Sequence, residues 1–234
     1  MAARLGTLPC SKEILPVPGA DGTLRPLCAD LLEAYAAVGI ERVYVVLREG
    51  KWDIPAFLGS GADFGLDIAY RVTPPTRGVL ETVDRAWPFV RDCRVALGFP
   101  DLQFSPREAF GALLDRAGEA DVVLGLFPAQ DPQGCDLVAT DVDGRVTEVQ
   151  IKPRRSPLRE TWMLALWGPA FTELVHREVA TLSARDTECH LGEGIRMALR
   201  NGLRVLGVRI PGGRCRDLGT PRALVGAWRE GAPD

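Results

Sequence analysis

The chain has 234 residues, of which 46% are hydrophobic and 25% charged, and this is enough to bury a globular core. Its formal net charge of −3 argues against a dedicated binder of nucleic acid or anionic membranes, because such proteins usually carry a basic surplus. No apolar run reaches the roughly 18 residues of a membrane-spanning helix, and residues 1–16 lack the apolar core of a signal peptide, so we expect a cytoplasmic protein.

The first 127 residues alternate between strand-like and helix-like segments. Strand-like patterns cover 43–47, which is a buried-strand run, 66–72, which alternates, and 94–98 and 121–127. Helical periodicity covers 27–39, 78–90 and 106–117, the last with Pro106 expected in its first turn. This order predicts an α/β fold with a mostly parallel, Rossmann-like sheet between two layers of helices.

After residue 127 the pattern changes to an antiparallel hairpin insertion. Strand-like runs at 136–140 and 145–151 are joined by Asp141-Val142-Asp143-Gly144, and Asp and Gly are typical of tight turns. The same Asp-x-Asp is also found at glycosyltransferase metal sites, which leaves a second, weaker interpretation open. Helices over 169–179 and 191–201, a strand over 203–209 and a helix capped by Thr220 follow. With no linker or repeat, we expect a single domain over 1–234.

Cysteine and histidine offer little chemistry in this sequence. The six cysteines form no Cys-x-x-Cys pair, so neither a zinc site nor a disulfide framework is indicated, and there are only two histidines. The chemistry must come from carboxylates, basic side chains and the backbone. Of 28 basic residues only three are lysines, namely Lys12, Lys51 and Lys152. Where arginine is so strongly preferred, a retained lysine hints that a compact ammonium is needed.

The segment 4–17 reads Arg-Leu-Gly-Thr-Leu-Pro-Cys-Ser-Lys-Glu-Ile-Leu-Pro-Val. Taken alone it is a loop with two solvated charges. It resembles the N-terminal signature of the sugar-1-phosphate nucleotidyltransferases, the family of glucose-1-phosphate thymidylyltransferases and uridylyltransferases. The resemblance implies that Arg4 and Lys12 act as catalytic residues on the phosphates of a nucleoside triphosphate. It also implies that Glu13 lies in the nucleotide site.

Later segments resemble the same family in the same order. Arg77-Gly78 at a helix start implies that Gly78 approaches the nucleobase. Leu97-Gly98-Phe99-Pro100-Asp101 resembles the family's Leu-Gly-Asp, and Asp217-Leu218-Gly219-Thr220-Pro221 its second acidic motif. The implied cofactor is Mg²⁺ held by Asp101 and Asp217, since oxygen ligands suit that ion. Without the family, both aspartates would be read as turn or cap residues.

Gln150-Ile151-Lys152-Pro153 resembles the family's Glu-Lys-Pro, whose lysine contacts the phosphate of the sugar phosphate. Lys152 would otherwise be a solvated charge at a strand end, which remains our interpretation of Lys51. Three features of these motifs depart from the family. Ile151 replaces a glutamate that touches the sugar, Thr73 stands where a base-reading glutamine is common, and Phe99-Pro100 inserts a residue ahead of Asp101. Only three residues precede Arg4, so the N-terminal Gly-rich turn of the family is missing. Either the start is misassigned or trimmed, or catalysis is weakened or absent, and we expect a divergent branch of the family.

The resemblance implies a reaction in which a sugar 1-phosphate attacks the α-phosphorus of a nucleoside triphosphate, giving an NDP-sugar and pyrophosphate. The alternative is a non-catalytic homologue that binds a nucleotide or NDP-sugar in a regulatory role. The expected partners are the two small-molecule substrates, with no nucleic acid and no membrane. A homo-oligomer is expected because the family often forms one.

Overall fold

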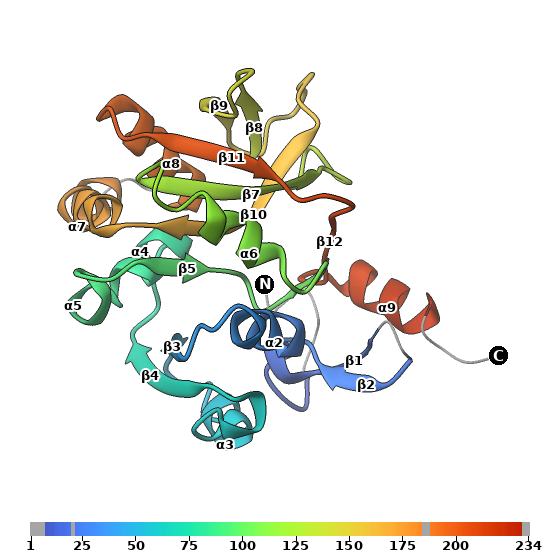
Figure 1. Cartoon of the computed structure of the whole chain (residues 1–234). Coiled ribbons are helices and arrows are strands. Elements are labelled where there is room, and N and C mark those ends of the chain that lie inside the picture. The colour runs from blue at the N-terminus through green and yellow to red at the C-terminus, as the bar shows by residue number, and fades with distance from the viewer. Residues whose placement is uncertain (1–7, 20–21, 184–187, 231–234) are drawn as a thin grey trace.

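The computed structural model describes residues 8–19, 22–183 and 188–230 (Figure 1), so Arg4 lies outside the described residues. Six strands form the main sheet in the order β11-β7-β10-β8-β9, with β5 also paired to β10. Their bounds are β5 (Val95–Leu97), β7 (Val122–Pro128), β8 (Leu137–Thr140), β9 (Val146–Gln150), β10 (Glu160–Trp167) and β11 (Val205–Arg209).

The main sheet is mixed, whereas the sequence predicted a mostly parallel one. Strands β7 and β11 are parallel, but β10 runs antiparallel to β5, β7 and β8, and β8 is antiparallel to β9. The difference comes from β10, which the sequence pattern missed. Six of its eight residues are buried, with burial on both faces, so the strand lacks the alternation that marks a half-exposed one.

Alternate residues of β7 contact two different layers of helices. Val123 and Phe127 pack into a core that includes residues of α2 (Ala29–Ala37) and α6 (Ala109–Asp115). Val122, Leu124 and Leu126 pack against α4 (Val79–Asp84), α7 (Pro169–Ser183) and α8 (Leu191–Arg200). Side chains alternate across a strand, so a strand with both faces buried requires cover on each side. The expected α/β fold with three layers is confirmed.

Two predicted helices have different bounds. The segment 78–90 splits into α4 and α5 (Trp87–Val90), because Pro88 has no N–H to continue the ladder of hydrogen bonds. Helix α6 begins at Ala109, so Pro106 is not in its first turn. The predicted cap of α9 (Pro221–Glu230) is confirmed, since the Ala223 N–H donates to the Thr220 hydroxyl oxygen (3.2 Å).

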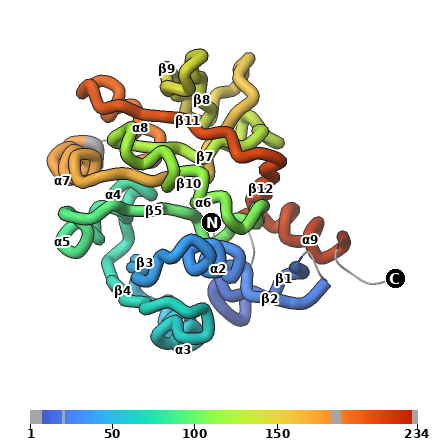
Figure 2. Tube along the Cα trace, in the orientation of Figure 1, coloured from blue at the N-terminus to red at the C-terminus, as the bar shows by residue number. Residues whose placement is uncertain are grey.

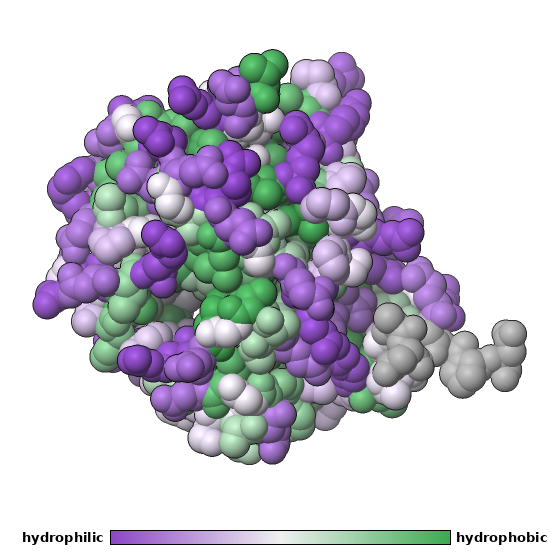
Figure 3. Space-filling model, in the orientation of Figure 1, coloured by the Kyte–Doolittle hydropathy of each residue, from purple (hydrophilic) through white to green (hydrophobic). Residues whose placement is uncertain are grey.

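Strands β3 (Arg42–Arg48) and β4 (Asp67–Thr73) form a separate parallel pair beside α3 (Asp53–Leu58). Among the described residues, β3 pairs only with β4, and β5 pairs only with β10. A cavity of about 1390 Å³ lies between these two strands and is lined along its length by apolar side chains such as Val43, Val45 and Leu97. The space-filling view is hollowed in the same region (Figure 3).

The remaining strands pair at the C-terminal side of the molecule. Strand β6 (Leu102–Ser105) is antiparallel to β12 (Arg214–Asp217), which places Asp217 opposite Leu102. Strands β1 (Pro16–Pro18) and β2 (Leu24–Pro26) form a hairpin, and α9 lies beside β1 (Figure 2). Short 3₁₀ turns cover η1 (Lys12–Ile14) and η2 (Ala62–Phe64). No helix in the described part of the chain is long and apolar enough to cross a membrane.

Candidate active site

The side chains of Lys12, Asp101 and Asp217 converge on one point, and the first two of them line the cavity. The Lys12 ammonium lies 2.5 Å from Asp101 Oδ2. A Cβ atom at Gly219 would lie 2.7 Å from Asp217 Oδ1 and 2.8 Å from Asp101 Oδ2. Glycine at this position therefore leaves room for both carboxylates to approach the same place.

The backbone explains how two distant aspartates meet. Asp101 lies in the turn between β5 and β6, and Asp217 ends β12, which pairs with β6. The Leu218 N–H donates to the Asp101 carbonyl oxygen (2.9 Å), and the Gly219 N–H donates to Asp217 Oδ1 (2.6 Å). Asp101 also follows the carboxyl end of β5, where open α/β sheets commonly bind ligands.

The electrostatics of this point favour a cation. Burial raises the pKa of Asp217 above its usual value, the Gly219 N–H lowers it, the charge of Asp101 raises it further, and Lys12 and Lys152 partly oppose the rise. Two converging carboxylates suit Mg²⁺, which is commonly held by one or two carboxylates while waters and substrate phosphates complete its shell. No group of three or more His, Cys, Asp or Glu side chains that could hold a metal occurs among the residues described.

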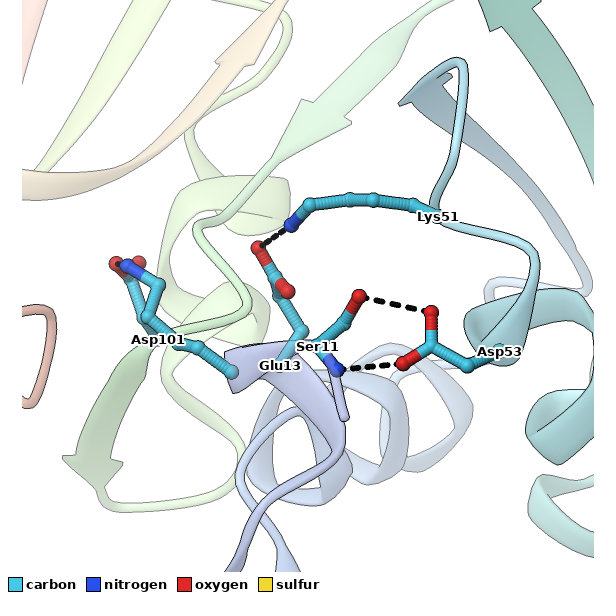
Figure 4. Close-up of polar contacts among 6 residues, drawn as sticks. Ser11, Glu13, Lys51, Asp53 and Asp101 are labelled. Carbon is cyan, nitrogen blue, oxygen red and sulfur yellow. Dashed lines mark hydrogen bonds and ion pairs between the residues drawn. The ribbon is translucent and has the colours of Figure 1, made fainter. Parts of the chain in front are cut away.

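The turn that enters α3 contacts the residues immediately before and after Lys12 (Figure 4). The Ser11 N–H donates to Asp53 Oδ2 (2.5 Å), and the Ser11 hydroxyl donates to Asp53 Oδ1 (2.8 Å). Lys51 Nζ donates to Glu13 Oε1 (2.6 Å). Burial raises the pKa of Asp53, but the hydrogen bonds from Ser11 and from nearby backbone N–H groups outweigh it and hold that pKa below its usual value.

The sequence did not single out Ser11 or Asp53, and it left Lys51 as a solvated charge. Their contacts join residues 38 and 42 positions apart, so no local sequence pattern predicts these contacts. The retention of a lysine at position 51, in a sequence that strongly prefers arginine, was a signal that pointed to this turn. Lys12, Glu13 and Asp101 all line the cavity between β3 and β5, as expected of residues that share one binding site.

Gly78 packs closely against another backbone segment. A Cβ atom there would lie 2.3 Å from the carbonyl oxygen of Cys189, and the Leu80 N–H donates to that same oxygen (3.2 Å). Close packing against the backbone of Cys189 is therefore sufficient to explain why residue 78 is a glycine. An approach of Gly78 to a nucleobase remains a prediction.

Lys152 follows β9 and has a φ of 39°, the only positive φ of a non-glycine residue among those described. Its charge lowers the pKa of Asp217, so it lies within electrostatic reach of the two aspartates. A second carboxyl lies close by, at Asp136, which the sequence analysis missed. Burial raises the pKa of Asp136, while His190, Lys152 and the N–H groups of Lys152 and Gly192 lower it.

The hairpin between β8 and β9 is confirmed, and its Asp-x-Asp serves the turn. Asp141 Oδ1 accepts hydrogen bonds from the N–H groups of Asp143 (3.0 Å) and Arg145 (2.8 Å). These local bonds explain the aspartate in this turn without a metal.

Comparisons with known proteins relate the chain to nucleotidyltransferases, although no family model matches it. It is 27% identical over 198 residues to the glucose-1-phosphate thymidylyltransferase of Streptomyces antibioticus, covering 80% of this chain and 52% of that protein. It is 24% identical to the low-salt glycan biosynthesis nucleotidyltransferase Agl11 of Haloferax volcanii over 221 residues, which cover 92% of this chain and 58% of the relative. The chain thus spans little more than half the length of these relatives.

A solved structure extends the likeness to the fold. The inositol-1-phosphate CTP transferase of T. maritima superposes with a TM-score of 0.77 at 17% identity, and the match covers all of this chain and 94% of that one. At this identity the match concerns the fold. The expected resemblance is therefore confirmed: the chain is similar in sequence to sugar-phosphate nucleotidyltransferases and shares the fold of a solved nucleotidyltransferase.

Proposed function

We propose that the protein is an enzyme that joins a nucleotidyl group to a sugar 1-phosphate. A phosphate oxygen of the sugar 1-phosphate attacks the α-phosphorus of a nucleoside triphosphate, and the bond from that phosphorus to the β-phosphate oxygen breaks. The products are an NDP-sugar and pyrophosphate. The observation that carries the proposal is the convergence of Asp217 with Lys12 and Asp101, two residues that line the cavity.

This transfer needs positioning and charge neutralisation and no covalent intermediate. In the proposal, Lys12 and Arg4 bind the phosphates of the triphosphate. Asp101 and Asp217 would hold Mg²⁺, which when bound supplies positive charge opposite the phosphate oxygens. Lys152 meets the phosphate of the incoming sugar phosphate, at a distance from Asp217 that lets their charges interact.

The remaining assignments concern the nucleotide. Glu13 lines the cavity beside Lys12 and is assigned to the nucleotide site. Gly78 lies at the start of α4, whose residue Val79 lines the same cavity, and is assigned to the base. Association of several copies and a cytoplasmic location stay predictions.

The direct test is a pyrophosphate-release assay over a panel of nucleoside triphosphates and sugar 1-phosphates, with Mg²⁺ and with a chelator in its place. We expect release with at least one substrate pair, and a loss of about 10²–10³ in rate for Asp101→Asn, as for other groups that stabilise transition-state charge. Asp143→Asn is the matched control, because Asp143 is exposed in the hairpin turn. Triphosphate binding without any turnover would support the regulatory alternative and overturn the enzyme.

A further inference from the structure

We propose that the turn entering α3 is a two-point clasp that positions Lys12, with Lys51 and Asp53 as its positioning residues. The inference rests on the proposed function, because it gives Lys12 its task at the triphosphate. The term clasp here means the contacts Asp53–Ser11 and Lys51–Glu13, which hold the residues immediately before and after Lys12.

The first point of the clasp fixes the backbone in front of Lys12. Asp53 accepts two hydrogen bonds from Ser11, one from its N–H and one from its hydroxyl. Both carboxylate oxygens are used, so the group fixes the orientation of Ser11 as well as its position. Hydrogen bonds to an ionised carboxylate are about twice as strong as bonds between neutral groups.

The second point fixes the residue behind Lys12. The side chains of Lys51 and Glu13 are 23% and 18% exposed, so their ion pair is shielded from much of the solvent. Among the described residues, Glu13 Oε2 is buried without a hydrogen-bond partner, which makes its bond through Oε1 costly to lose. The Glu13 carbonyl oxygen is bound as well, by the N–H of Cys28 (2.9 Å).

Between these two points the chain has little freedom. Residues 12–14 form the 3₁₀ turn η1, closed by hydrogen bonds from the Ile14 N–H to Ser11 O and from the Leu15 N–H to Lys12 O, both 3.1 Å. With Ser11 and Glu13 fixed, the Lys12 side chain leaves the turn towards Asp101, where 13% of it is exposed. Figure 4 shows Lys51 and Asp53 reaching this loop from the same side.

Amine labelling tests the clasp without any assay of activity. Lys12, Lys51 and Lys152 are the only lysines of the sequence, so mass spectrometry after acetylation of the native protein resolves each one. We expect Asp53→Ala and Lys51→Met to raise the labelling rate of Lys12 severalfold. The rate of Lys152 is the internal control for global loosening and should not change. An unchanged rate at Lys12 in both variants would overturn the proposal.

Turnover measurements test whether Asp53 and Lys51 act through Lys12, by comparing their variants with and without Lys12→Ala. In the wild-type background we expect Asp53→Ala and Lys51→Met to raise the KM for the triphosphate, or lower kcat, by about 10–100-fold, as for other residues that orient a ligand-binding group. The KM for the sugar phosphate should stay within about twofold. In a Lys12→Ala background the same changes should add less than about twofold, because a residue that acts through Lys12 has nothing left to position.

Several controls separate the possible failures. Asp63→Ala, in the exposed turn η2, should leave labelling and turnover unchanged. If Asp53→Ala folds poorly, Asp53→Asn replaces it as the test variant. Asparagine keeps an acceptor oxygen for Ser11, so we expect Asp53→Asn to lose less turnover than Asp53→Ala. If the enzyme is active and the effects of Asp53→Ala or Lys51→Met on turnover are fully additive with that of Lys12→Ala, the clasp is refuted and the proposed function stands. An inactive wild type with labelling as expected would refute the proposed function alone.

Discussion

Asp217 is a partly buried carboxyl with another carboxyl and two lysines near it, and its pKa is raised chiefly by burial. A carboxyl whose pKa is higher in the folded state favours folding while it is protonated, and this advantage is lost as pH rises through that pKa. The window begins near the ordinary value of 3.8 and extends upward to the raised one. At neutral pH the ionised Asp217 therefore lowers stability, which agrees with its proposed role in binding a cation.

The first prediction at this scale is that Asp217→Asn stabilises the fold and abolishes turnover. Asparagine keeps an acceptor for the Gly219 N–H but carries no charge. At pH 7 we expect its thermal midpoint to be a few degrees above that of wild type, where about 1 kcal/mol corresponds to ~2–4 °C for a chain of this length. The gap should shrink as the pH is lowered towards 4. A wild type more stable than the variant at pH 7 would contradict this account.

The second prediction concerns Lys12 and its exchange for arginine. Lys12→Arg keeps the positive charge, but a planar guanidinium directs its N–H groups differently from a compact ammonium and would not reproduce the 2.5 Å contact of Lys12 with Asp101 Oδ2. We expect kcat/KM for the triphosphate to fall by about 100-fold, to be measured by steady-state pyrophosphate release. The reverse exchange, Arg71→Lys on an exposed position of β4, is the control and should be neutral. Equal activity of Lys12→Arg and wild type would show that only charge matters at position 12.

At the scale of elements, α8 begins directly against the Lys152 loop. A Cβ atom at Gly192 would lie 2.3 Å from Asp136 Oδ2 and 3.2 Å from a side-chain carbon of Ile151. Because that carboxyl also lies beside the backbone N–H of Lys152, the glycine lets the helix, the carboxylate and the loop pack together. The position of Lys152 thus depends on the start of a helix about 40 residues further along the chain.

This packing predicts the effect of Gly192→Ala. The added methyl group must displace Asp136, and we expect the KM for the sugar phosphate to rise about tenfold with little change in the KM for the triphosphate. Gly118→Ala is the matched control, because a Cβ atom there would meet nothing within 4 Å. Initial-rate kinetics with each substrate varied in turn distinguishes the two. A rise confined to the KM for the triphosphate would contradict the assignment of Lys152 to the sugar phosphate.

The elements also show what the sequence could predict. Periodicity predicted β3, β4, β7 and α2 because each is amphipathic or bounded by turn residues. It missed β10, which has no alternation, and the pairing of β6 with β12, which joins residues more than 100 positions apart. The order of motifs indicated Lys12, Asp101 and Asp217, and the structure brings all three together. Ser11, Asp53 and Asp136 were missed because their partners are distant in sequence and their residue types are common in any loop.

At the scale of the whole molecule, the inner strands of the main sheet are hydrogen-bonded to more neighbours than the separate pair β3 and β4. Strand β7 is hydrogen-bonded on both edges, to β10 and β11, and both of its faces are buried. Within the described chain, β3 is bonded only to β4 and faces the cavity on its other edge. Local opening costs less where fewer backbone hydrogen bonds and apolar contacts must break. Lys12 and the clasp lie beside the β3–β4 pair, which has fewer backbone hydrogen bonds than β7. We therefore expect ligand binding to stabilise the β3–β4 pair against local opening.

Amide hydrogen exchange followed by mass spectrometry checks that link. We expect peptides covering β3 and β4 to exchange at least about tenfold faster than peptides covering β7 and β10, which corresponds to a difference in opening free energy of about 1.4 kcal/mol. A saturating nucleoside triphosphate should slow exchange in β3 and in the turn entering α3, because the bound state must keep Lys12 in place, and it should leave β7 unchanged. Slower exchange spread evenly over all strands would instead show that the sheet opens as one unit. In that case the contacts of the clasp would not be tied to a separately opening part of the fold.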